Sequence, residues 1–131
     1  MDDIEYAEQH ERAQANARAK ASQAVTTFAN DWSAAEARVG ITMHRPEYWR
    51  KMPLAACRAG LSSNHAKGVI DQAAYLVSKG EMAPMRAHRY VAATLRKIAE
   101  QRAAAAVLED AARAERAERY ERSRAEAEAS A

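Results

Sequence analysis

The chain has 131 residues, which is enough for one domain or for one small core with extensions. Ala, Arg and Glu dominate the composition, and four Gly and three Pro leave few helix breakers, so we expect an all-α fold. The single Cys57 excludes an internal disulfide and favours a reducing compartment. The N-terminus lacks a secretory signal and no segment reaches the roughly 18 apolar residues of a membrane span, so we expect a cytoplasmic protein without a membrane partner.

The charges are distributed unevenly along the chain, whose formal net charge is only +2. Residues 1–43 hold four Lys or Arg against seven Asp or Glu, and residues 100–131 hold six against eight. Residues 44–99 hold ten against three. A basic block between two acidic arms favours a phosphate-bearing partner.

The first predicted helix runs from Asp3 to Val39 and ends at Gly40, which suits a left-handed cap. Apolar residues recur every three or four positions over 21–39, whereas polar residues fill the same positions before residue 21. We therefore expect residues 21–39 to pack on a core and residues 1–20 to project as a polar half-helix.

Three shorter helices are predicted in the middle of the chain. Pro46 starts a helix over residues 47–52, and Pro53 breaks or restarts it, so that a second helix reaches Ala59 and closes at Gly60. Ser62 or Ser63 caps a third helix that ends at Gly80. One side of the third helix carries a predicted apolar face: Ala66, Val69, Ile70, Ala73, Leu76 and Val77.

The last predicted helix begins between Met82 and Met85, with Pro84 in its first turn. Its predicted buried stripe consists of Met85, Val91, Leu95, Ile98, Ala105 and Leu108. Pairs of Glu and Arg at i,i+4 follow, each worth roughly 0.2–0.5 kcal/mol of helix stability: Glu109/Arg113, Glu115/Arg119 and Glu118/Arg122. We expect a core of four to five helices over residues 21–108 and a charged, exposed helical tail over 109–131.

Residues 54–70 resemble a helix-turn-helix in their spacing, inside a basic segment that spans residues 46–80. Five positions match the motif: Ala56, Gly60, Leu61, Ser62 and Val69. Two positions depart from it. The motif has a branched aliphatic residue where this chain has Ala66, and Gly68 weakens the second helix unless a close approach to DNA or to another helix requires it.

The helix-turn-helix interpretation assigns a role to seven side chains. Ser62, Ser63, Asn64 and Lys67 would face the major groove, where Asn pairs with adenine and Lys favours guanine. Arg50, Lys51 and Arg58 would bind phosphates. RNA binding would use the same electrostatics, and a basic helix–Gly–helix corner without a nucleic-acid ligand has the same spacing.

Other residue clusters favour structural interpretations. Tyr48 and Trp49 either stack on bases or cover the core, and we favour the core. A second basic cluster either extends a phosphate surface or forms a solvated face: Arg86, Arg89, Arg96 and Lys97. The four His residues lack metal-ligand spacing. Cys57 and His65 suggest either a nucleophile with a base or a lone core thiol, and we favour the core thiol because Cys57 falls on the predicted small-residue face. We expect no metal, no cofactor and no catalytic constellation.

Together these features predict a small, non-enzymatic DNA-binding protein of the regulator or phage/plasmid accessory type. The helical arms favour a homo-oligomer. A helix-turn-helix protein gains from forming a dimer, because a dimer reads two half-sites. The alternative is a helical protein-interaction module or inhibitor that docks on a protein target through its basic middle or an exposed arm.

Overall fold

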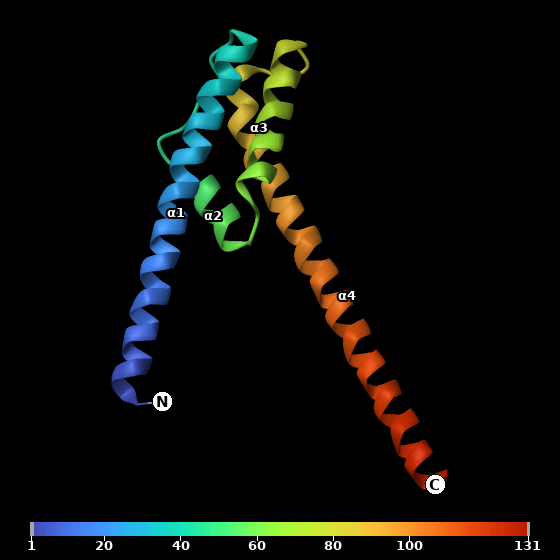
Figure 1. The fold of residues 1–131 in the computed structure, drawn as a ribbon. Helices are drawn as coiled ribbons and strands as arrows, with labels where there is room; N and C mark the ends of the chain where they lie inside the picture. Colours follow the sequence, from blue (N-terminus) through green and yellow to red (C-terminus); the bar gives the residue numbers. More distant parts are fainter. Residues whose placement is uncertain (1, 131) are drawn as a thin grey trace. The chain divides into compact units, whose positions relative to one another are not determined.

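The protein is built from helices joined by short turns, and the computed structural model describes residues 2–130 without a strand among them (Figure 1). The helices follow in the order α1 (Asp3–Val39), α2 (Lys51–Arg58), α3 (Ser63–Ser78) and α4 (Ala87–Ser130), with a 3₁₀ turn η1 (Pro84–Arg86) before α4. The predicted all-α class is confirmed. One compact unit ends at Ala99, and a second unit from Glu100 onward consists of the rest of α4.

Helix α1 has the predicted ends, and a local signal explains each of them. At its start the Asp2 side chain accepts a hydrogen bond from the Glu5 N–H (2.8 Å). At its end Gly40 has φ +70° and donates its N–H to the Glu36 carbonyl (2.9 Å). Every side chain of residues 2–20 is exposed, whereas the second half of the helix buries Phe28.

The prediction of two short helices around Pro53 was wrong. Residues 47–50 form turns, in which Trp49 donates its N–H to the Pro46 carbonyl, and the single helix α2 then continues through Pro53. Pro53 is the third residue of α2, where a backbone N–H has no acceptor within the helix. The proline ring therefore removes no hydrogen bond, and the helix does not break.

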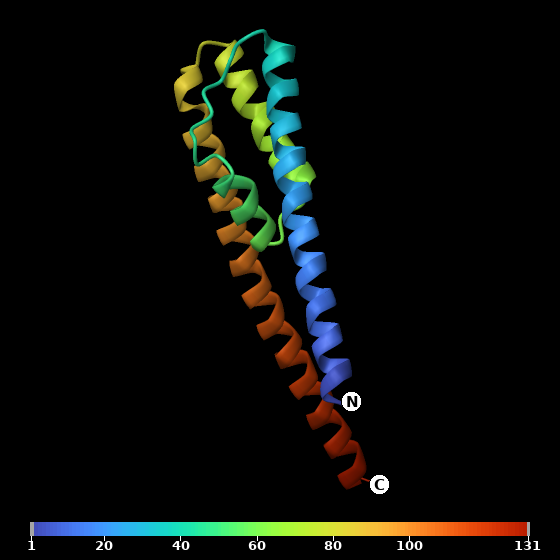
Figure 2. The ribbon, with the colours of Figure 1, turned by 90° about the vertical axis from the view of Figure 1, so that its left-hand side faces the viewer.

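The core lies among α1, α2, α3 and the first turns of α4, and helix α1 contacts both α2 and α3 (Figure 2). Many of its buried residues are alanines, whose small side chains let helices pack closely. The buried residues of the core cluster are Phe28, Trp32, Ala35, Met43, Ala56, Leu61, Ala66, Val69, Ile70, Ala73, Ala74, Val77, Ala87, Val91 and Leu95. The predicted face of α3 is confirmed except at Leu76, which is half-buried.

The predicted stripe of α4 is correct only in its middle. Val91 and Leu95 are buried, whereas Met85 is 71% exposed and Leu108 is 72% exposed. Ala105 is also exposed. Ala105 and Leu108 belong to the second unit, which begins at Glu100 and whose described part is the rest of α4. None of the described helices is long and apolar enough to cross a membrane.

Two of the three predicted ion pairs form along the later part of α4. Arg113 lies 3.4 Å from Glu109, and Arg119 lies 2.9 Å from Glu115. In place of the predicted Glu118/Arg122 pair, the described tail holds Arg124–Glu128 (3.4 Å). All of these side chains are exposed, so each pair contributes little beyond local helix stability.

Candidate nucleic-acid interface

A tight turn joins α2 to α3, and four of the predicted site residues lie at the start of α3: Ser62, Ser63, Asn64 and Lys67. Gly60 has φ +78°, a conformation that glycine adopts without a steric cost, and it donates its N–H to the Cys57 carbonyl (3.0 Å). Leu61 then turns into the core and donates its N–H to the Ala56 carbonyl (3.0 Å). Ala56 itself is buried, so the small residue lies where the two helices approach.

Ser62 is the N-cap of α3, as predicted. Its extended backbone precedes the helix, and its Oγ accepts a hydrogen bond from the His65 N–H (3.4 Å). The same Oγ lies 2.8 Å from His65 Nδ1. The Ser62 hydroxyl therefore orders the first turn of α3 and holds the exposed His65 ring beside it.

Beyond the cap, α3 has one buried side and one exposed side. Ala66 and Val69 are buried, whereas Asn64, Lys67 and Gly68 are exposed. A Cβ atom on Gly68 would have no neighbour within 4 Å. Close packing between helices of this chain therefore does not explain the glycine.

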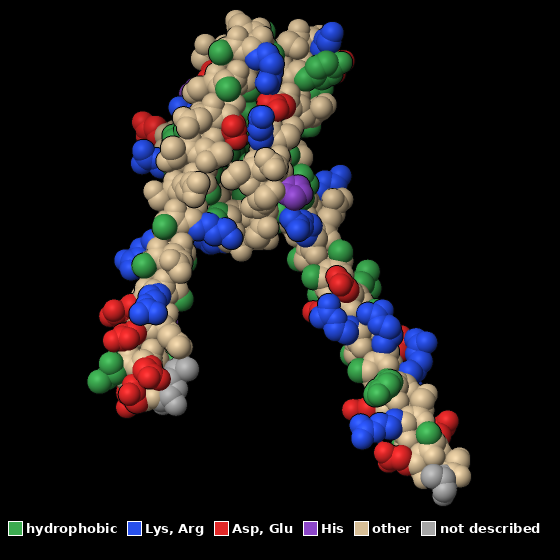
Figure 3. Space-filling view, in the orientation of Figure 1, with side chains coloured by type: hydrophobic (Ala, Val, Ile, Leu, Met, Phe, Trp, Pro, Cys, Tyr) green, Lys and Arg blue, Asp and Glu red, His purple; other side chains and the backbone are tan. Residues whose placement is uncertain are grey.

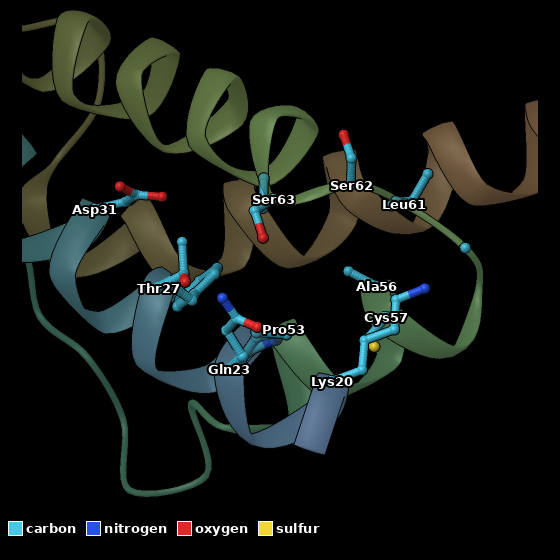
Figure 4. A pocket seen from close by; sticks show the side chains of 14 residues that line it. Lys20, Gln23, Thr27, Asp31, Pro53, Ala56, Cys57, Leu61, Ser62 and Ser63 are labelled. Atoms are coloured by element: carbon cyan, nitrogen blue, oxygen red, sulfur yellow. The ribbon is translucent and has the colours of Figure 1, made fainter. Parts of the chain in front are cut away.

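A cavity of about 400 Å³ lies between α1 and the α2–α3 turn (Figure 4). Lys20, Gln23 and Thr27 line it from α1. Across the cavity the Ser63 hydroxyl points toward α1, whereas the Ser62 hydroxyl points away from it (Figure 4). Sequence reasoning missed the α1 residues, although polar positions 20, 23, 27 and 31 recur with helical spacing beside the apolar seam.

Lys67 of α3 has two acidic side chains in its surroundings, Asp31 of α1 and Asp71 of α3. Burial raises the pKa of the half-buried Asp31 carboxyl on α1; the positive charge of Lys67 partly opposes this shift, and the negative charge of Asp71 adds to it. Asp71 is also bound by Arg38 of α1 (2.7 Å). Two acidic side chains therefore reduce the positive potential around Lys67.

The three predicted phosphate-binding residues lie at the two ends of α2. Lys51 begins the helix and Arg58 ends it, about 10 Å apart along the axis and on nearly the same face. Both side chains are exposed, and so is Arg50, which precedes the helix. On the face of the compact unit seen in Figure 3, Lys and Arg side chains are scattered and do not form one continuous patch.

Trp49 and Tyr48 differ in their surroundings. The Trp49 ring stacks on Phe28, with 6.0 Å between ring centroids, and the guanidinium of Arg45 lies 4.5 Å from its centroid. The Arg50 guanidinium lies 5.7 Å from the same ring. Trp49 thus covers the core, as we favoured, whereas Tyr48 is 60% exposed.

No protein-family model, curated protein or solved structure matches this chain. Within residues 2–130, no three His, Cys, Asp or Glu side chains come together as a metal-binding group. The exposed Asn64 and Lys67 after the Gly60 turn make the corner formed by α2, this turn and the start of α3 the candidate site.

Proposed function

We propose that this protein is a small, non-enzymatic DNA-binding protein of the regulator or phage/plasmid accessory type. The observation that carries the proposal is the corner itself. Gly60 reverses the chain, Ser62 caps α3, and the next turn exposes Asn64 and Lys67. An exposed helix start beside a basic helix is the arrangement that helix-turn-helix proteins insert into the major groove.

The proposed contacts divide into base reading and backbone binding. Asn64 pairs with an adenine edge and Lys67 with guanine, whereas the Ser63 hydroxyl points toward α1 and the Ser62 hydroxyl caps α3. Arg50, Lys51 and Arg58 bind phosphates and set the register of the protein on the duplex. Lys20 of α1, which lines the cavity at this corner, adds a cation that the sequence interpretation lacked.

A fluorescence-anisotropy titration with mixed-sequence duplex DNA tests the proposal. Because phosphate binding releases counterions, the affinity should fall at least about tenfold between about 50 and 200 mM salt. A parallel titration with RNA of the same length separates the two nucleic acids. If the protein binds neither duplex DNA nor RNA at low salt, the proposal is wrong.

The variant Asn64→Ala/Lys67→Ala should lose preference for a selected site and keep its fold, because both side chains are exposed. Each lost base contact is worth about 1–3 kcal/mol of discrimination. The matched control is Gln72→Ala/Lys79→Ala. It also removes an amide and a lysine from exposed positions, which lie in the second half of α3 and at its C-cap, outside the predicted site. Equal specificity in the two double variants would remove Asn64 and Lys67 from the site.

The second candidate function is a helical protein-interaction module or inhibitor that docks on a protein target. The observation that favours it is the position of Asp31 and Asp71 beside Lys67, because carboxylates near a recognition helix repel the DNA backbone. A protein target presents both charges and tolerates such a mixed surface. Absence of salt-dependent DNA binding would favour this candidate.

A further inference from the structure

A groove lies between α2 and the first turns of α4 within the compact unit. It encloses about 360 Å³. Its floor is apolar and includes Met52, Ala55, Leu95 and Ala99. The charged side chains that line it are both cations, Lys51 and Arg96, and both are exposed. We call this site the α2–α4 groove.

The chain also carries a segment whose chemistry complements this groove. Residues 2–11, which comprise the N-cap and the first turns of α1, are called the acidic arm below. They hold five Asp or Glu and no Lys or Arg. Ile4 is 71% exposed, and Ala7 follows it by one helical turn. Glu8 and Glu11 lie at i+4 and i+7 from Ile4, so they share its face of the helix.

The arm of a chain cannot fill its own groove. Helix α1 is continuous from Asp3 to Val39, and its buried second half is fixed in the core. Ile4 therefore lies about 24 Å along the helix axis from residue 20, beyond the end of the packed half. Figures 1 and 2 both show this end of α1 extended away from α2. Filling the groove from within one chain would require α1 to break.

We propose that the acidic arm of one copy of this protein docks in the α2–α4 groove of a second copy. Ile4 and Ala7 enter the apolar floor, and Glu8 and Glu11 pair with Lys51 and Arg96 at the rim. The contact is confined to one helix end in one groove, and interfaces that bury less than roughly 1,200 Å² are typically weak, so we expect the association to be reversible and to depend on concentration. The inference does not rest on DNA binding, since the contact forms without nucleic acid.

Charge reversal in two separate chains tests the contact. One variant is Glu8→Lys/Glu11→Lys in the arm, and the other is Lys51→Glu/Arg96→Glu in the groove. Each variant alone places like charges together, so self-association measured by sedimentation velocity should weaken about tenfold or more. In an equimolar mixture, a pair made of one copy of each variant has opposite charges at its arm–groove contacts, so association should recover through these mixed pairs.

A control separates this contact from a general attraction between oppositely charged proteins. Lys79→Glu/Lys97→Glu changes the net charge as the groove variant does, at exposed positions that do not line the groove. When these control substitutions are added to the arm variant in one chain, the arm and the groove both stay basic, so association should not recover, whereas adding Lys51→Glu/Arg96→Glu to the arm variant restores opposite charges and should recover it. Circular dichroism checks that each variant is folded.

Three outcomes would overturn the proposal. The first is a wild-type protein that stays monomeric at every concentration. The second is self-association that the arm variant leaves unchanged, because another segment would then occupy the groove. The third is equal recovery of association when the groove substitutions and the control substitutions are each added to the arm variant in one chain. None of these outcomes bears on DNA binding, which is measured separately by anisotropy.

Discussion

At the scale of single residues, Met43 shows how a connector becomes part of the core. Its carbonyl accepts a hydrogen bond from Trp32 Nε1 (3.2 Å), and its N–H donates to the Glu36 carboxylate (2.7 Å). With both backbone groups paired, the Met43 side chain is buried at no cost in unsatisfied polar groups. Two side chains of α1 therefore fix the path of the connector that leads to α2.

His88 at the start of α4 predicts a pH dependence of stability. Burial lowers the pKa of His88, and the positive charge of Arg89 and the nearby His44 lower it further. The His44 ring lies 5.9 Å away, edge-on, and His88 Nδ1 is buried without a partner. The folded state therefore favours the neutral ring, whereas the unfolded chain binds a proton near pH 6.5.

We expect the free energy of unfolding to be highest above about pH 6.5 and to fall as the pH drops toward the lowered pKa of His88. Urea unfolding at pH 7.5 and 5.5 measures the difference. His88→Gln should reduce the pH dependence, and His10→Gln, on the exposed arm, should not. The same loss of stability in the wild type and in His88→Gln would show that another group is responsible.

At the scale of elements, the two glycines of the α2–α3 corner have opposite roles. Gly60 has φ +78°, which places the chain in the left-handed region at the turn. Gly68 lies inside α3 with open space around its Cα atom. One glycine is thus required by the backbone, while the other weakens a helix without any packing reason in this chain.

Alanine substitutions at these glycines should therefore change stability in opposite directions. Gly60→Ala should destabilise by about 1–2 kcal/mol, because an L-residue is strained at positive φ. Gly68→Ala should stabilise by about 0.5–1 kcal/mol, because it lowers the entropy cost of the helix and meets no neighbour within 4 Å. Urea unfolding of both variants measures the two shifts. Changes of the same sign would contradict the roles assigned here.

At the scale of the whole molecule, the two units of the chain differ both in apolar packing and in charge. The apolar core lies within the unit that ends at Ala99, and so does the excess of Lys and Arg over residues 44–99. From Glu100 onward the chain is an exposed helix rich in Ala, Glu and Arg. Local ion pairs such as Arg119–Glu115 support that helix, and it adds little buried apolar area.

Deletion of residues 110–131 should consequently change the stability of the compact unit by less than about 1 kcal/mol. Thermal unfolding followed by circular dichroism measures the change, with an expected loss of helix signal but an almost unchanged melting temperature. A drop of many degrees would show that the tail packs on the body or on a partner subunit. The arm–groove contact should survive this deletion, because neither of its surfaces includes the deleted residues.

Features that depend on neighbours along the chain were predictable from the sequence. The ends of α1, the positive φ of Gly60 and the cap at Ser62 follow from short-range rules on glycine, capping side chains and backbone N–H groups. The buried face of α3 follows from apolar residues at helical spacing. Each of these predictions needs only a few consecutive residues.

Other features were decided only by the tertiary structure. Periodicity groups Leu108 with Val91 on one stripe of α4, but the packed unit ends at Ala99 and leaves Leu108 exposed. Met43 is buried because Trp32 and Glu36 bind its backbone. The Asp31 carboxylate of α1 acts on Lys67 of α3, and the α2–α4 groove forms between helices that are also far apart in sequence. A repeat along one helix defines a face, whereas burial and charge depend on which other helix reaches that face.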